Sequence, residues 1–160
     1  MANYISWPLL SGIALIIRNH LRLLVSSFKI LTGENILASD CDIDNISREI
    51  FFAPFAVMSH GLEADPIFNY ANQCALDLFE MTWEDFIKQP SRLSAEADSQ
   101  EERNRILKKV LENGYVDDYT GVRITNQGKR FQIKNAIVWN VVDQDRHYGQ
   151  AALIRDWAFL

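Results

Sequence analysis

Cysteine is scarce in this 160-residue chain, which contains only Cys41 and Cys74. Two cysteines cannot build a disulfide framework of several bridges, and neither belongs to a metal-ligand spacing such as Cys-x-x-Cys. Disulfides are rare in the cytoplasm, where thiols are kept reduced. The sequence therefore predicts two reduced thiols in a cytoplasmic protein.

An excess of positive charge is also lacking. Sixteen lysines and arginines stand against 21 acidic residues, which gives a formal net charge of −5. Domains that bind nucleic acid usually carry a basic patch or stripe. We therefore expect this chain to bind no nucleic acid by itself.

Long apolar runs are missing as well. The run at residues 9–17 is followed by Arg18, His20 and Arg22, whereas a spanning helix needs about 20 mainly apolar residues. No positive charge precedes the run and no small-residue cleavage site follows it, so it does not match a signal peptide. We expect a soluble protein without a transmembrane segment.

What the chain does have is an apolar stripe near its N-terminus. Seven residues recur at alternating spacings of four and three: Leu10, Ala14, Ile17, Leu21, Leu24, Phe28 and Leu31. This spacing predicts one face of a helix, which Thr32 and Gly33 end. The flanking positions lack the alternating charges of an exposed coiled coil. The stripe is therefore expected to pack on a sheet or on the helix of a second copy.

These two alternatives define the predicted domains: an N-terminal amphipathic helix in residues 1–35, a connector in 36–50 and a main domain in 51–160. If the helix joins two copies, the chain is a homodimer. The predicted interface residues are then Leu10, Ile17, Leu21, Leu24 and Phe28.

The C-terminal third predicts three antiparallel strands. Residues 115–125, 129–142 and 147–157 are separated only by short polar loops, and strands joined in this way pair as a meander. Two short strands are predicted upstream, at residues 55–59 and 66–70. The sequence thus indicates an α+β fold with a five-stranded antiparallel sheet.

Helices are predicted between the second and third strands. Asn72 and Thr82 are suitable N-caps for two short helices. Ser99 and Glu102 form a capping box for a longer helix, and Gly114 is suited to end it. We expect the short helices to lie on one face of the sheet.

This order of elements resembles a PAS domain, as do residues 56–58 and the stretch 67–72. A closer resemblance is to the MEKHLA domain family, a PAS-like family. It is carried by residues 54–61, 64–73, 90–96, 121–124 and 138–140. The resemblance covers roughly residues 10–157. It implies a module that senses a signal or controls dimerisation, with no generally established ligand. The hexapeptide that names the plant members is absent, so the chain is identified as a free-standing microbial member of the cyanobacterial or algal type.

This sequence lacks the residues that two kinds of cofactor-binding PAS relatives use. Flavin photoreceptors of this fold place their reactive cysteine in an Asn-Cys-Arg-Phe-Leu-Gln run, whereas Ala75 follows Cys74. Haem-binding members use a histidine on the long helix, and residues 99–113 contain none. Flavin-cysteinyl and haem chemistry are therefore not expected, and the cofactor is left unknown. No metal site is expected either, because no histidine pair has helical ligand spacing.

Alternation in the long strand suggests a ligand-facing surface. Residues 131, 133, 135, 137 and 139 share one parity, and Tyr119 and Arg123 are predicted to face the same side from the neighbouring strand. A buried arginine either anchors the acidic or amide end of a ligand or pairs with Glu63, Asp65 or Asp118. It can also face solvent across a bulge at Gly121. The predicted ligand-binding residues are Tyr119, Arg123, Phe131, Asn135 and Trp139.

Three functional hypotheses follow. The first is a non-catalytic PAS-like sensory or regulatory module that acts through a small ligand and a protein partner. The second is a small-molecule enzyme on a cone-shaped α+β sheet, with Asp77 or Arg123 in its active site. The third is an adaptor that lies on a membrane surface, with Arg18, Arg22 and Lys29 facing anionic lipid. No catalytic residue is assigned, because no nucleophile elbow or facing pair of carboxylates is present.

Overall fold

The computed structural model describes residues 11–38 and 42–160, with side chains from Leu15 onward in the first helix. Leu10 and Cys41 lie outside the described residues. None of the described helices is both long and apolar enough to span a bilayer.

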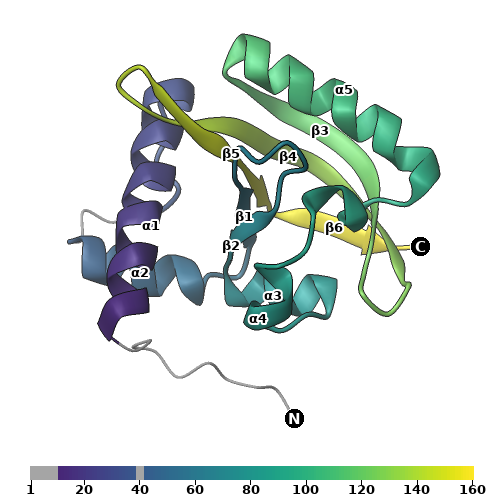
Figure 1. The fold of residues 1–160 in the computed structure, drawn as a ribbon, viewed down its shortest axis with the longest axis horizontal. Helices are drawn as coiled ribbons and strands as arrows, with labels where there is room; N and C mark the ends of the chain where they lie inside the picture. Colours follow the sequence, from purple (N-terminus) through teal and green to yellow (C-terminus); the bar gives the residue numbers. More distant parts are fainter. Residues whose placement is uncertain (1–10, 39–41) are drawn as a thin grey trace.

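Six strands of the described chain form one antiparallel sheet (Figure 1). Five of them follow the order β2-β1-β5-β4-β3. Their bounds are β1 Ala56–His60, β2 Phe68–Ala71, β3 Tyr115–Ile124, β4 Arg130–Asp143 and β5 Arg146–Ile154. The sixth, β6 (Asp156–Phe159), pairs with β4 beyond the end of β5. The α+β prediction is confirmed, and the extra strand arises because the last predicted strand is interrupted at Arg155.

Helices cover both faces of this sheet (Figure 1). One face carries α1 (Ser11–Thr32) and α2 (Ile43–Phe51). The other face carries α3 (Gln73–Phe79), α4 (Trp83–Phe86), the 3₁₀ helix η1 (Ser91–Ser94) and α5 (Ala97–Asn113). We call the side of α3 and α5 the inner face and the side of α1 the outer face. The predicted connector, residues 36–50, contains most of α2.

A bulge in β4 reverses the alternation of its side chains. Tyr119 pairs with Ala136 and Gly121 with Ile133, so β4 has one residue more than β3 over this stretch. The extra residue is Asn135, whose φ is 50°. The prediction that residues 131 to 139 keep one parity is therefore wrong beyond Asn135.

Two ring contacts show this reversal directly. Phe131 packs edge-on against Phe79 of α3, with ring centroids 5.2 Å apart, and so lies on the inner face. Trp139 packs in the same way against Phe28 of α1, at 4.9 Å, and so lies on the outer face. An alternation read from the sequence places both on one side, because it does not include the extra residue.

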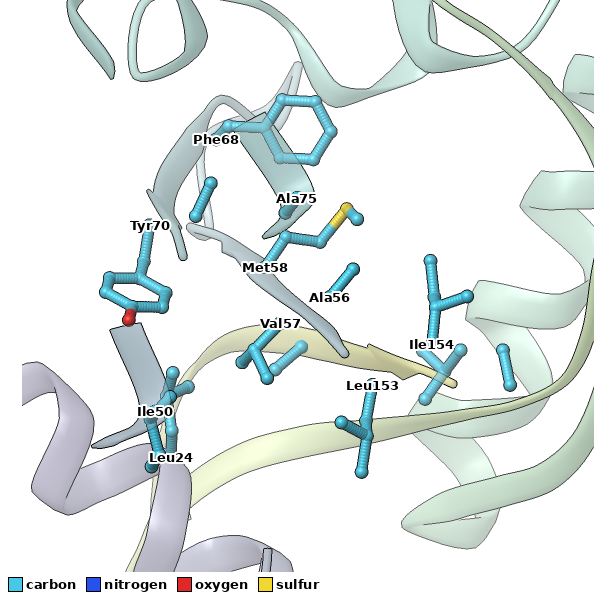
Figure 2. Packing of buried hydrophobic residues seen from close by; sticks show 14 of the residues in the cluster. Leu24, Ile50, Ala56, Val57, Met58, Phe68, Tyr70, Ala75, Leu153 and Ile154 are labelled. Atoms are coloured by element: carbon cyan, nitrogen blue, oxygen red, sulfur yellow. The ribbon is translucent and has the colours of Figure 1, made fainter. Parts of the chain in front are cut away.

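The apolar face of α1 packs on the sheet of its own chain. Ile17 is 5% exposed, and Leu21, Leu24 and Phe28 are each 0% exposed. Figure 2 shows Leu24 beside Ile50 of α2, on the side of β1 opposite to Met58. This corrects the prediction that these residues form a dimer interface, since they already fill a core. The alternative in which the helix caps the sheet describes the structure.

The predicted helix ends agree with the structure at four of five positions, and the first is the end of α1 at Thr32 and Gly33. Asn72 and Thr82 cap α3 and α4 through their side chains, and Gly114, with a φ of 93°, ends α5. The predicted capping box at Ser99 is wrong, because α5 begins at Ala97 and Glu96 has the N-cap position without a side-chain bond. Ser99 already belongs to the first turn, where its N–H donates to the Glu96 carbonyl at 2.9 Å.

Gly149 permits the close pairing of β5 with β1. Its φ is 150°, and a Cβ atom at this position would lie 2.0 Å from the backbone oxygen of His60. We expect Gly149→Ala to lower the free energy of unfolding by about 2–3 kcal/mol in urea denaturation. Gly128→Ala is the control, because Gly128 also has a positive φ, 82°, but open space around it. Equal losses in the two variants would contradict the close-approach explanation.

Candidate ligand-binding cavity

A cavity of about 70 Å³ lies between the inner face of the sheet and α5. This volume accommodates a few water molecules or a small ligand. Apolar side chains from both strands and helices form most of its wall: Met58, Phe68, Phe79, Ile106, Leu107, Ile133, Val138 and Ile154. Ala151 and Ala152 of β5 also line it, and Ala151 pairs with Trp139 of β4.

Two arginines bring positive charge to this wall. Arg103 of α5 is 6% exposed and Arg123 of β3 is 8% exposed. Arg103 donates from Nη2 to Ser91 Oγ at 2.6 Å. Arg123 donates from Nη2 to Tyr119 Oη at 2.6 Å and from Nη1 to the Val122 carbonyl at 2.8 Å. Its guanidinium carbon also lies 5.1 Å from the centroid of the Tyr119 ring.

Neither arginine forms an ion pair within the described part of the chain. Asp65, one predicted partner of Arg123, pairs with Arg92 at 3.1 Å instead. Glu63 accepts a hydrogen bond from the Ile67 N–H at 3.3 Å, and Asp118 is exposed. The cavity therefore contains two buried cations whose protein partners are neutral.

This environment acts on the protonation of Arg103. Burial and, to a smaller extent, the positive charge of Arg123 lower its pKa from 12.5 to about 10. Tyr119 and Asp65 act in the opposite direction. Arg103 remains charged at neutral pH, and the positive charge of Arg123 repels it.

His60 and Gln150 lie at another part of the cavity wall. Burial lowers the pKa of His60 below its usual 6.5, while its hydrogen bond to the Gly61 carbonyl raises it. Its Nε2 has no hydrogen-bond partner among the described residues. Gln150 Nε2 donates to the Leu107 carbonyl at 2.9 Å and so ties β5 to α5.

The structure brings together two of the five predicted ligand residues. Tyr119 and Arg123 line the cavity. Phe131 is fully buried on the same face and packs against Phe79 of the cavity wall, but does not itself line the cavity. Asn135 is exposed at the bulge and Trp139 faces α1, so the prediction of these two as cavity residues is corrected.

Sequence reasoning missed Arg103, although a signal was present. Arg103, Ile106, Leu107 and Val110 recur at spacings of three, four and seven, which places them on one face of a helix. An arginine that begins an apolar stripe is a candidate buried cation.

Cys74 and Asp77 lie on α3 and do not line this cavity. Cys74 is half-buried, and burial followed by the negative charge of Asp77 raises the pKa of its thiol. A raised pKa keeps the thiol protonated and weakly reactive. The described residues contain no cluster of three or more metal-ligating side chains.

A second polar cluster connects α1 to the sheet through His20. Since Ser59 Oγ donates to Asn69 Oδ1 at 2.5 Å, His20 Nε2 donates to Ser59 Oγ at 2.7 Å. Burial lowers the pKa of His20 from 6.5 to about 4. Between about pH 6.5 and 4, His20 is therefore neutral in the folded protein but protonated in the unfolded chain.

We expect stability to fall as the pH drops from about 6.5 to 4, by about 2–3 kcal/mol from His20 alone. Urea denaturation at a series of pH values measures this slope, and His20→Gln should reduce it. His60 and His147 titrate in both proteins, so the difference between the two slopes isolates His20. An unchanged slope in His20→Gln would contradict the assignment.

Comparison with known proteins first identifies a family. The family model of the MEKHLA domain matches residues 18–159. The chain is 26% identical over 147 residues to the homeobox-leucine zipper protein ATHB-9 of Arabidopsis thaliana, covering 87% of this chain and 17% of that protein. It is 29% identical over 129 residues to the homeobox-leucine zipper protein HOX29 of Oryza sativa subsp. japonica, covering 78% and 15%. The chain thus spans about one sixth of the length of these relatives.

Solved structures show a similar fold at low identity. A PAS domain from Colwellia psychrerythraea matches with a TM-score of 0.61 and 17% identity, covering 71% of this chain and 95% of that one. A fungal LOV domain photoreceptor matches with a TM-score of 0.57 and 11% identity, covering 88% and 91%. The fold is therefore PAS- and LOV-like.

Proposed function

The chain belongs to the MEKHLA domain family, and from this premise we propose that it is a non-catalytic sensory or regulatory module that binds a small molecule in the cavity under α5. The observation that carries the proposal is a cavity with apolar walls and two buried guanidiniums in a PAS-like fold. Small-molecule sites are typically concave and mostly apolar, with a few polar groups that orient the ligand.

The attachment of α5 suggests how binding is transmitted. Asn140 Nδ2 donates to the Val110 carbonyl at 3.0 Å, and Gln150 Nε2 donates to the Leu107 carbonyl. Arg103 contributes to the cavity from the same helix. A ligand that contacts both α5 and the sheet changes the position or the mobility of α5, whose opposite side is exposed to partners.

Association with a protein partner and homodimerisation belong to the same proposal. Four of the five residues predicted for the dimer interface are buried in their own chain, so a homodimer has to use another surface. Light scattering at several protein concentrations tests this part. A strict monomer at every concentration contradicts the homodimer without affecting ligand binding.

The compartment and the source of the protein also remain proposals. The half-buried free thiol of Cys74 is compatible with a cytoplasmic location. The curated relatives described above are plant proteins, and a free-standing microbial member stays a prediction.

The other two hypotheses receive no specific support. Asp77, one candidate of the enzyme hypothesis, lies outside the cavity, and no carboxylate is among the described residues of the cavity wall. Of the cations assigned to a membrane surface, Arg18 pairs with Asp44 at 2.6 Å and Lys29 donates to the Gly33 carbonyl at 2.9 Å.

Native mass spectrometry of freshly purified protein tests the proposal. We expect a small molecule to remain bound to the wild type. Ala152→Leu fills part of the cavity and should reduce its occupancy at least about tenfold, a loss of about 1.4 kcal/mol in binding. Val122→Leu is the control, because Val122 points away from the cavity on β3. Equal occupancy in the wild type and Ala152→Leu would place the ligand elsewhere.

A further inference from the structure

We infer that the ligand of this cavity is a small organic carboxylate, bound at its charged end by Arg103 and Arg123 and at its apolar end by the cavity wall. This inference rests on the proposed function and names the chemical class of the ligand. It follows from the donors that the two arginines leave unused, from the repulsion between them, from the neighbouring hydroxyls and from the size and lining of the cavity.

The first argument counts hydrogen-bond donors. A guanidinium has five N–H groups and no acceptor. Among the described residues, Arg103 uses one hydrogen bond to Ser91, and Arg123 uses two, to Tyr119 and the Val122 carbonyl. Both side chains are more than nine-tenths buried and line the same cavity. A buried charge with neutral partners is costly, and an anion in the cavity removes this cost.

The second argument is the repulsion between the arginines. The positive charge of Arg123 disfavours the charged form of Arg103. Two like charges held in a low-dielectric site destabilise the unliganded protein. A carboxylate that contacts both guanidiniums turns this repulsion into two attractions, with the short, paired hydrogen bonds that arginine forms to carboxylates.

The third argument concerns the two hydroxyls beside the arginines. Ser91 Oγ and Tyr119 Oη each accept a hydrogen bond from a guanidinium, and neither donates its own hydrogen to a described residue. The position of Tyr119 also requires Gly121, because a Cβ at Gly121 would lie 2.6 Å from the Tyr119 hydroxyl. Tyr119 lines the cavity, so the part of the wall beside the two arginines presents mainly donors, which matches a ligand group that only accepts.

The fourth argument is the rest of the wall. Ile106, Ile133, Val138 and Ile154 offer no hydrogen bond to a ligand. Inorganic phosphate would leave this apolar surface without a partner, and a nucleotide is too large for a cavity of about 70 Å³. A carboxylate of two or three carbons fits the charge, the lining and the volume.

Matched pairs of probes test this inference on the full chain. The carboxylates are acetate and propanoate, and the neutral controls are acetamide and propanamide. Calorimetry and thermal shift should show binding of at least one carboxylate, at least about tenfold more tightly than its amide, because hydrogen bonds to a charged group are stronger. Inorganic phosphate should bind more weakly than that carboxylate.

Three variants show whether the arginines carry the binding. Arg103→Met and Arg123→Met should each weaken carboxylate binding at least about tenfold. Arg105→Met, at an exposed position on the same helix, should leave it unchanged. If a methionine variant does not fold, Arg103→Lys keeps the charge but loses the planar fork, and ¹⁵N shifts of the arginine side chains on adding the carboxylate report contact in the wild type.

The outcomes separate this inference from the proposed function. Equal binding of amide and carboxylate, or tighter binding of phosphate, overturns the carboxylate inference and leaves a ligand-binding cavity. A neutral molecule found bound to the protein by native mass spectrometry also overturns the carboxylate inference and leaves a ligand-binding cavity. No binding of any probe together with an empty cavity in native mass spectrometry overturns both. Carboxylate binding that persists in both arginine variants overturns the assigned site.

Discussion

Replacing Asn72 by alanine should lower the free energy of unfolding by about 3–5 kcal/mol. Its side chain is 0% exposed and makes four hydrogen bonds to the backbone of three elements and their connections. Oδ1 accepts from the N–H groups of Val57 and Ala75, both at 3.0 Å. Nδ2 donates to the carbonyls of Ile50 at 2.9 Å and Phe55 at 2.8 Å.

Alanine removes all four partners at once and leaves buried donors and acceptors unsatisfied, which is why the expected loss exceeds that of an ordinary helix cap. Urea denaturation followed by tryptophan fluorescence measures the loss. Gln73→Ala, one residue later on α3, is the matched control and should change stability by less than about 1 kcal/mol. An Asn72→Ala variant as stable as this control would contradict the role described here.

Replacing Phe28 by alanine should cost about 3–5 kcal/mol, which is usual for the loss of a buried aromatic ring. Phe28 is 0% exposed and packs edge-on against Trp139. The neighbouring Ser27 Oγ accepts a hydrogen bond from Trp139 Nε1 at 3.1 Å. The substitution therefore leaves a cavity where α1 meets β4. It also removes a ring that packs against Trp139, so the Trp139 side chain becomes more mobile.

The control for this prediction is Ile30→Ala, since Ile30 is 72% exposed on the same helix; it should change stability by less than about 0.5 kcal/mol. Denaturation at two protein concentrations adds a second test. If α1 caps its own sheet, the cost of Phe28→Ala is the same at both concentrations. A cost that depends on protein concentration would restore the dimer interpretation of the helix.

The candidate site could be predicted from the sequence in part. Alternation on β3 predicts Arg123 and Tyr119 correctly, because the pattern is local and the strand is long. The same pattern on β4 predicts the wrong surface for Asn135 and Trp139, because one additional residue reverses the alternation. A bulge of this kind depends on how two strands pair, and the pattern of one strand does not contain that information.

The sequence by itself determined the order and type of the elements except α2 and β6, and most of their ends. Asn72, Thr82 and Gly114 act on backbone groups a few residues away, so their effect is encoded locally. The tertiary structure alone decided that the apolar stripe of α1 covers its own sheet, and that Arg103 meets Arg123. These two arginines belong to a helix and a strand that become neighbours only when α5 packs over the sheet. Which buried charges share a cavity is therefore set by packing between elements, which local sequence signals do not specify.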